Sequence, residues 1–278
     1  MKKFILWSLA FIITIAAAIY QRHTGPTYPK ELDVTVNNNH YELQLVRSLS
    51  LDERSEVKLN INDSTVHARI FFKRFKSDEE FQVADFKFRA EAKKEGFFAE
   101  VPQQPAAGKI QYYFEISDSK GTQTYFKEAP VVIRFKGGVP AFILVPHILF
   151  MFFAMLFSTL AGLMAVIKYP MYKRYAIWTF ILFTAGGMVL GPVVQYYAFG
   201  DLWTGIPFGW DLTDNKTLIA FLFWILAVVM NRKKDRPLYT ALAALVLLLV
   251  FSIPHSLLGS ELDYTSGQVT QGIILNFF

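Results

Sequence analysis

Two histidines in the apolar part of the chain each follow a proline directly. They stand in the stretches VPHIL (145–149) and IPHSL (253–257). Neutral imidazole is the commonest metal ligand in proteins and an axial ligand of haem iron. Ionisable side chains at membrane depth are costly, which makes them functional candidates by default. His147 and His255 therefore predict a site for a divalent metal ion or for haem.

Carboxylates in the neighbouring polar segments could complete such a metal site. Imidazole and carboxylate together suit zinc, copper or another divalent ion. The predicted metal ligands are His147, His255, Asp211, Asp214, Glu261 and Asp263. Haem would use only the two histidines as axial ligands. The chain contains neither His-Glu-x-x-His nor His-x-His, and it has no haem-attachment motif.

A purely structural role for the same residues is the alternative. A proline removes a backbone donor and can end a helix, which frees carbonyl oxygens for the histidines to bind. Asp214 would then serve only as a helix N-cap. Lys216 would pair with Asp211 or Asp214.

The elements that position these residues are long uncharged runs. Residues 4–21 follow two lysines and form either a signal peptide or an uncleaved anchor, assigned to residues 1–22. No charge lies between Lys136 and Lys168, between Arg174 and Asp201, or between Arg236 and Glu261. Each run exceeds the roughly 20 residues that cross a bilayer. The sequence thus predicts a four-helix transmembrane bundle over residues 141–258.

One of these four spans is short in its uncharged part. Thr217–Asn231 has 15 residues, and a helix of that length covers roughly 22 Å of a ~30 Å hydrocarbon core. The helix is therefore expected to extend through Lys216 to about Asp214. Its N-terminus would close an outer loop over residues 199–216.

Basic residues predict the orientation of the bundle. The loops at 168–174 and 231–236 are rich in Lys and Arg and are separated by two spans. Such loops lie on the cytoplasmic side of a membrane. Residues 30–137, the loop 199–216 and the tail 259–278 are then extracytoplasmic, and the chain is a multi-pass protein of the cytoplasmic membrane.

Residues 30–137 show the alternation of apolar and polar residues that is typical of half-buried strands. Strands are predicted at 32–36, 41–46, 65–72 and 109–118. A further strand follows the turn at 118–121 and ends at residue 126, and the last is predicted at 131–135. Asn37-Asn38-Asn39 and Asp118-Ser119-Lys120-Gly121 are predicted turns. About seven strands in such a length favour a β-sandwich.

The run GKIQYYFEI (108–116) with the turn after it resembles the penultimate hairpin of immunoglobulin-like and fibronectin-type-III-like domains. The resemblance covers residues 30–137 only. It implies an all-β sandwich in which Tyr112 takes the tyrosine-corner position, where a hydroxyl bonds backbone a few residues upstream. It implies no particular activity.

Composition excludes several classes of function. The chain has no cysteine, which rules out disulfides, thiolate metal sites and a lipoprotein anchor. The net charge of +5 comes from the short basic loops, because residues 23–136 carry 17 basic and 17 acidic side chains. No basic stripe marks a nucleic-acid surface.

Two functions compete on this basis. The first is an envelope binding or assembly subunit, anchored in the lipid bilayer, whose external domain engages other envelope proteins. The second is a membrane redox or metal-handling protein with its site at His147 and His255. No residue is assigned a catalytic role.

Overall fold

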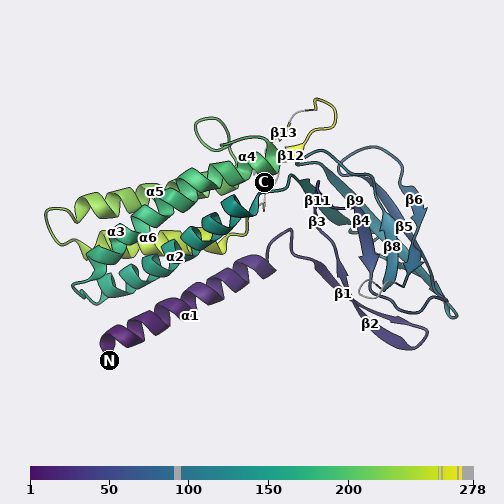
Figure 1. Cartoon of the computed structure of the whole chain (residues 1–278), viewed down its shortest axis with the longest axis horizontal. Coiled ribbons are helices and arrows are strands. Elements are labelled where there is room, and N and C mark those ends of the chain that lie inside the picture. Colours follow the sequence, from purple (N-terminus) through teal and green to yellow (C-terminus); the bar gives the residue numbers. More distant parts are fainter. Residues whose placement is uncertain (91–94, 256, 258, 268, 271–278) are drawn as a thin grey trace. The chain divides into compact units, whose positions relative to one another are not determined.

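The computed structural model describes residues 1–90, 95–255, 257, 259–267 and 269–270 (Figure 1). The chain divides into two compact units. The helical unit contains Met1–Pro26 and Val139–Ser260, and the β unit contains Thr27–Gly138 together with Glu261–Thr270. The chain therefore leaves the β unit, builds the helices and returns to the β unit afterwards.

The β unit holds every strand of the described chain. Its strands are β1 (Lys30–Val36), β2 (Asn39–Leu45), β3 (Ser48–Ser50), β4 (Glu56–Leu59), β5 (His67–Arg74), β6 (Gln82–Asp85), β7 (Lys87–Arg89), β8 (Gly96–Glu100), β9 (Lys109–Asp118), β10 (Gly121–Tyr125), β11 (Val131–Lys136), β12 (Glu261–Leu262) and β13 (Val269–Thr270). One sheet has the order β3-β11-β9-β5-β6, with β10 also paired to β9. A second has the order β4-β8-β7, and β1-β2 and β12-β13 are two-stranded.

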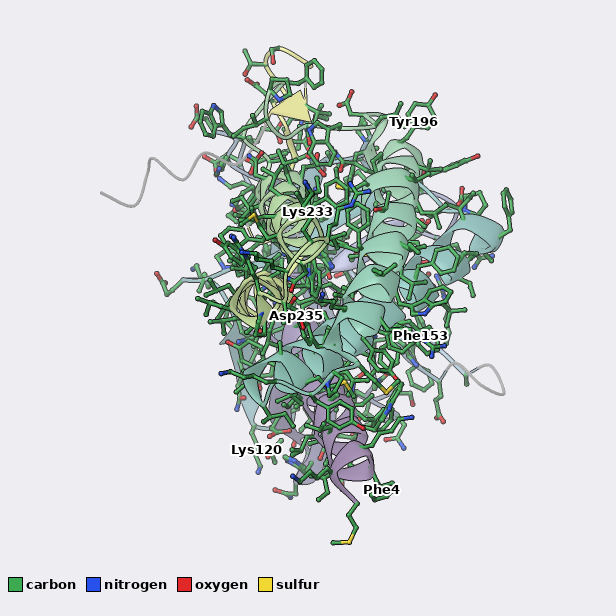
Figure 2. The ribbon with its side chains drawn as sticks, turned by 90° about the vertical axis from the view of Figure 1, so that its left-hand side faces the viewer. Phe4, Lys120, Phe153, Tyr196, Lys233 and Asp235 are labelled. Atoms are coloured by element: carbon green, nitrogen blue, oxygen red, sulfur yellow. The ribbon has the colours of Figure 1, made fainter. Side chains whose placement is uncertain are left out.

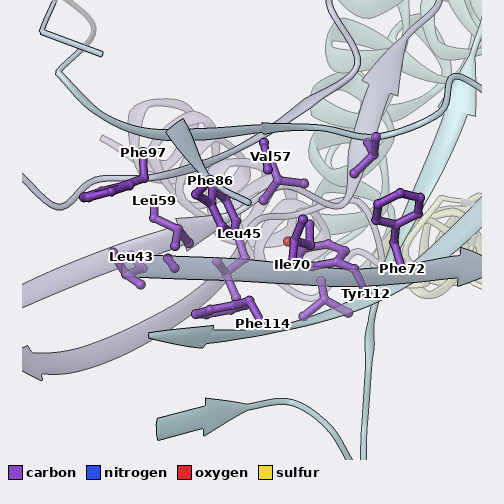
Figure 3. Packing of buried hydrophobic residues seen from close by; sticks show 14 of the residues in the cluster. Leu43, Leu45, Val57, Leu59, Ile70, Phe72, Phe86, Phe97, Tyr112 and Phe114 are labelled. Carbon is purple, nitrogen blue, oxygen red and sulfur yellow. The ribbon is translucent and has the colours of Figure 1, made fainter. Parts of the chain in front are cut away.

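One hydrophobic core joins the sheets of the β unit (Figure 3). Leu45 from the hairpin, Leu59 from β4 and Phe114 from β9 all lie fully buried in it. Burying a side chain of this size stabilises the fold by about 1.5–3 kcal/mol. The predicted strand segments are confirmed, and so is the inward face of β9, where alternate residues from Ile110 to Ile116 are buried.

Tyr112 does not make the bond expected of a tyrosine corner. Its hydroxyl donates to the carbonyl oxygen of Val46 at 3.3 Å, and that residue is 66 positions upstream rather than a few. The bond links β9 to the end of the β1-β2 hairpin across the core. The β-rich architecture is thus observed without this signature of the immunoglobulin-like family.

The segment after the last helix is bound to the β unit by several polar contacts. The backbone N–H of Leu262 donates to the carbonyl of Ala107 at 3.1 Å. The carboxylate of Glu261 lies 2.9 Å from Nζ of Lys109 and 3.1 Å from Nζ of Lys76. The sequence had suggested a separate tail from residue 259, whereas these residues complete a sheet domain that begins more than 200 positions earlier.

The helical unit contains α1 (Lys2–His23), α2 (Ala141–Val166), α3 (Tyr172–Phe183), the π-helix η1 (Thr184–Leu190), α4 (Gly191–Phe199), α5 (Leu212–Met230) and α6 (Pro237–Ser252). Four helices are long and apolar enough to cross a membrane: α1, α2, the continuous helix Tyr172–Phe199 and α5. The apolar α6 has 16 residues. Large apolar side chains such as Phe4, Phe153 and Tyr196 project outward from the helices (Figure 2).

The N-terminal helix packs into the helical unit along one face. Its buried residues are Leu6, Ala10, Thr14 and Ala17, which recur at helical spacing. They lie against α2 and α6, and Trp7 meets the rings of Phe157 and Tyr175 edge-on. The helix is therefore the fifth member of the bundle.

Asn231 joins three helices at the end of the bundle that carries the basic loops. Its side-chain oxygen accepts from the hydroxyl of Tyr172 at 2.7 Å and from the backbone N–H of Arg236 at 2.8 Å. Its amide nitrogen donates to the carbonyl of Ala227 at 2.8 Å. These bonds satisfy a carbonyl group in the last turn of α5 and a backbone N–H at the start of α6. They also hold the tight turn between the two helices in place.

Candidate functional site

Four helices bring polar groups together at the end of the bundle opposite the basic loops. The first turns of α2 meet η1, and the second turn of α5 meets both η1 and the segment after α6. From Lys216 to the end of α5 at Met230 is a rise of about 21 Å at 1.5 Å per residue. A hydrocarbon core of ~30 Å that starts at the basic loops would thus contain this layer in the half away from those loops.

His147 is held in one tautomer by the neighbouring π-helix. Its Nδ1 lies 2.9 Å from the carbonyl oxygen of Gly186. A carbonyl oxygen only accepts hydrogen bonds, so Nδ1 carries the proton and Nε2 keeps its lone pair. Histidines that bind metals are commonly oriented in this way by a second bond to a backbone carbonyl.

Glycine makes this contact possible. A Cβ on Gly186 would stand 2.9 Å from Cβ of Phe150 and 3.0 Å from Sδ of Met151, closer than side chains approach. The absence of a side chain lets η1 lie directly against α2. The π-helix at this contact was not predicted from the sequence.

Lys216 caps the C-terminus of α6 from a neighbouring helix. Pro254 follows shortly after the end of α6 at Ser252, so the last carbonyls lack the helical partners that a continued helix would provide. The buried ammonium of Lys216 donates to the carbonyl oxygens of Ile253 at 2.6 Å and Pro254 at 3.5 Å. A cation is favourable at this negative end of the helix dipole. These carbonyls, rather than a carboxylate, are its hydrogen-bond partners.

His255 directly follows Pro254, whose carbonyl oxygen accepts from Lys216, and its side chain is exposed. His147 lies at the same end of the helical unit through its bond to η1. The two histidines predicted to share a site therefore lie in the same polar layer. Their joint use as metal or haem ligands remains a prediction.

The two aspartates of the outer loop have structural partners. Asp211 is the N-cap of α5 and accepts from the backbone N–H groups of Thr213 at 2.8 Å and Asp214 at 3.2 Å. Asp214 accepts from the backbone N–H of Thr204 at 2.6 Å and from Nε2 of Gln195 at 3.2 Å. The helix begins at Leu212, slightly before the predicted position, and Asp211 takes the capping role expected of Asp214.

The other two predicted ligands lie in the β unit. Glu261 forms the ion pairs with Lys109 and Lys76, and Asp263 accepts from the backbone N–H of Thr265 at 2.8 Å and of Ser266 at 3.3 Å. The four predicted carboxylate ligands thus have other partners: Asp211 caps α5, Asp214 bonds the loop before it, Glu261 forms ion pairs and Asp263 bonds backbone N–H groups.

A second group of potential ligands was missed from the sequence. Within the described chain, the one set of three His, Asp or Glu side chains with ligand atoms within 4.8 Å of one another is Asp33, His40 and Glu42. None of these three residues is among the metal ligands predicted from the sequence. The group could have been found from the predicted hairpin turn at Asn37-Asn38, because the turn fixes which residues of the two strands face each other.

The chain was compared with models of known protein families and with curated proteins, and neither comparison gave a match.

Proposed function

We propose that this chain is a multi-pass protein of the cytoplasmic membrane that holds its β unit outside the cytoplasm as a binding module for other envelope proteins. The bundle anchors the module in the lipid bilayer. Among the described residues, the chain passes between the module and its anchor near residues 26, 138 and 260.

The return of the C-terminal segment is the observation that carries the topology. Tyr264 and Glu261 bind Lys109 directly, so both ends of the intervening chain lie on one side of the membrane. An even number of crossings must separate them. The helices α2, Tyr172–Phe199, α5 and α6 supply four, which supports a membrane-spanning role for the short α6.

The positions of the basic loops support the direction. The loop after α2 and the loop after α5 contain the basic clusters around Lys168 and Lys233. Lys233 and Asp235 lie in the second of these loops (Figure 2). By the positive-inside rule both loops face the cytoplasm, which leaves the β unit outside.

A face of aromatic and cationic side chains is the surface proposed for partner binding. On the side of β5 and β9 away from the core, the rings of Phe71 and Tyr113 stack with centroids 4.6 Å apart, and Phe81 meets Tyr113 at 5.0 Å. Arg69 lies over Phe71 and Lys73 over Phe81. Aromatic residues and arginine are enriched at protein interfaces.

Single cysteines test the topology, because the natural chain has none. Glu128→Cys in the β unit and Thr265→Cys in the returning segment should react in intact cells with a membrane-impermeant maleimide. Lys233→Cys should react only after the membrane is opened. Labelling of Lys233→Cys in intact cells would overturn the proposal.

Photo-crosslinking tests the binding role. A photoreactive residue at Val83, an exposed position on β6 beside the aromatic face, should give discrete adducts with envelope proteins in cells. The same residue at the exposed Thr122 on β10 is the matched control. Equal adducts from both positions would argue against a binding face at β5, β6 and β9.

A metal or haem site at His147 and His255 is the second candidate function. The bond from Nδ1 of His147 to Gly186 supports it, because it leaves Nε2 available to a ligand. Haem supplies four equatorial nitrogens itself and needs only two axial histidines. A zinc site commonly needs at least three protein ligands. The donor set therefore suits haem better than a bare ion.

A visible spectrum of the purified chain tests this second function. A Soret band that disappears in His147→Ala and in His255→Ala, and persists in His67→Ala, would support haem binding. His67 is exposed on the outer side of β5 and serves as the control. A spectrum without a Soret band from haem-supplemented cells would remove haem as the ligand.

A further inference from the structure

Three potential metal ligands converge on one face of the β1-β2 hairpin. Asp33 lies directly opposite Glu42 in the antiparallel register, and His40 is paired with Thr35 on the same face. Nε2 of His40 lies 3.7 Å from Oδ1 of Asp33. All three side chains are exposed, and their ligand atoms lie within 4.8 Å of one another.

This face of the hairpin carries acidic side chains and neither lysine nor arginine. Its side chains are those of Glu31, Asp33, Thr35, His40, Glu42 and Gln44, since the alternate residues point into the core. Like charges directly opposite each other on neighbouring strands are destabilising. In the described part of the chain, neither Asp33 nor Glu42 has a Lys or Arg within 4.0 Å. A bound cation would relieve this repulsion.

The hairpin is rigid enough to present the three ligands together. On its inner side Val34, Val36, Leu43 and Leu45 are buried in the core. At its tip Asn37 and Asn38 adopt positive φ angles of 46° and 68°, which suit a tight turn between twisted strands.

The side chain of Asn37 also ties the tip to the rest of the unit. It donates to Asp63 at 2.8 Å and accepts from the hydroxyl of Ser119 at 2.7 Å. Ligands on a supported strand pair keep their mutual geometry better than ligands on a loop.

We propose that Asp33, His40 and Glu42 form a binding site for a divalent transition-metal ion, with Zn²⁺ as the ligand to test. One imidazole and two carboxylates match the nitrogen and oxygen donors that Zn²⁺ takes at about 2.0–2.2 Å. The ligand atoms lie within 4.8 Å of one another, and rotation of these exposed side chains would bring them to the coordination distances of Zn²⁺. The imidazole distinguishes this site from acidic clusters that favour Ca²⁺.

Three protein ligands leave one position of a tetrahedral zinc ion open. Water or a donor side chain of another protein would occupy it. The site faces away from the core and is independent of how the helices are oriented. It remains a metal site even if the proposed binding role of the β unit is wrong.

Zinc titration of the full chain in detergent tests the proposal. The chain should carry His147→Ala and His255→Ala, so that the other candidate site contributes nothing. ZnCl₂ is titrated in competition with a chromophoric chelator, and we expect one equivalent to bind. His40→Ala, Asp33→Asn and Glu42→Gln should each weaken binding by at least about tenfold, the smallest loss typical when even an outer-shell partner of a metal ligand is removed.

His67→Ala is the matched control, because it also removes an exposed strand histidine of the β unit. It should leave the zinc affinity unchanged. A Co²⁺-loaded sample should show the visible absorption of a four-coordinate ion, and His40→Ala should lose it. Equal zinc binding by the His40→Ala and His67→Ala variants, or none by the parent chain, would overturn the proposal.

Discussion

The phenol oxygen of Tyr264 bonds both backbone groups of Lys109. It accepts from the N–H at 2.9 Å and donates to the carbonyl oxygen at 2.9 Å. A single side chain thus satisfies the donor and the acceptor of one residue at the start of β9, as a neighbouring strand would. The two residues are 155 positions apart, and the four helices from α2 to α6 lie between them in the chain.

Replacement of Tyr264 should weaken the β unit. Tyr264→Phe removes both bonds and leaves two part-buried backbone groups of Lys109 without them, which should cost about 1–3 kcal/mol. Chemical denaturation of the full chain in detergent, followed by circular dichroism in the β region, measures the loss. Tyr125→Phe is the control, because its hydroxyl bonds only an exposed glutamine. Equal stability of both variants would contradict the proposed role of Tyr264.

Attachment of the C-terminal segment should weaken in acid. Burial would raise the pKa of Glu261, but hydrogen bonds and charge from Lys109 and Lys76 outweigh it and lower this pKa below 4.5. A carboxyl group with a lowered folded-state pKa stabilises the fold above its unfolded pKa. That contribution disappears as the pH falls through the folded value. Burial also lowers the pKa of Lys109, yet an ammonium remains protonated in acid, so the loss comes from Glu261.

Glu261→Gln should remove the pH-dependent stabilisation that the ionised carboxylate of Glu261 provides. The parent chain is expected to lose more stability between pH 6 and pH 3 than the variant does. Asp63 and Asp118, whose pKa values are lowered by hydrogen bonds from Asn37, respond alike in both proteins. The measurement is the free energy of unfolding at the two pH values, and an identical decrease in both would contradict the prediction.

The N-terminal helix should remain in the mature protein. Its buried face packs against α2 and α6, so its removal would expose Leu156, Leu160 and Met164 of α2. Intact mass spectrometry of the purified protein should find residues 1–22 present. Ala10→Leu places a larger side chain at a position with no exposed surface, and should cost about 1–3 kcal/mol. Phe11→Leu on the exposed face should cost less.

The outer loop should open when Asp214 is removed. Asp214→Ala leaves the backbone N–H of Thr204 and the amide of Gln195 without their carboxylate partner. We expect protease cleavage between residues 200 and 211 and a stability loss of about 1–3 kcal/mol. Asp214→Asn should be milder, because its carbonyl oxygen still accepts from Thr204. Asp201→Ala, which alters an exposed residue of the same loop, is the control.

Periodicity located β1, β2, β5, β9, β10 and β11, but it did not locate β3, β4, β6, β7 or β8. Alternation of apolar residues located strands such as β5 and β9, because a strand with one buried face must repeat every second residue. Charge-free runs located the helices for a similar reason. The return of Glu261–Thr270 to the β unit was not predicted, since β12 and β13 have two residues each and show no measurable period.

Sequence position misled the assignment of the carboxylates. Glu261 and Asp263 were grouped with His255 because they are close in the chain, yet their side chains bind groups of the β unit. His147 and His255 were grouped by their expected depth in antiparallel helices, and their joint role as ligands stays a prediction. The π-helix that orients His147 leaves no composition pattern beyond its glycines, so the tautomer could not be predicted.

The division of the β unit between residues 27–138 and 261–270 has a consequence for biosynthesis. A ribosome makes the chain from its N-terminus, and domains ordinarily fold as units while synthesis continues. Here the strand pair that completes the sheet domain emerges only after α6 has been made. The final bonds from Tyr264 and Glu261 to Lys109 can therefore form only once the whole bundle has been synthesised, which makes them the last step in building the β unit.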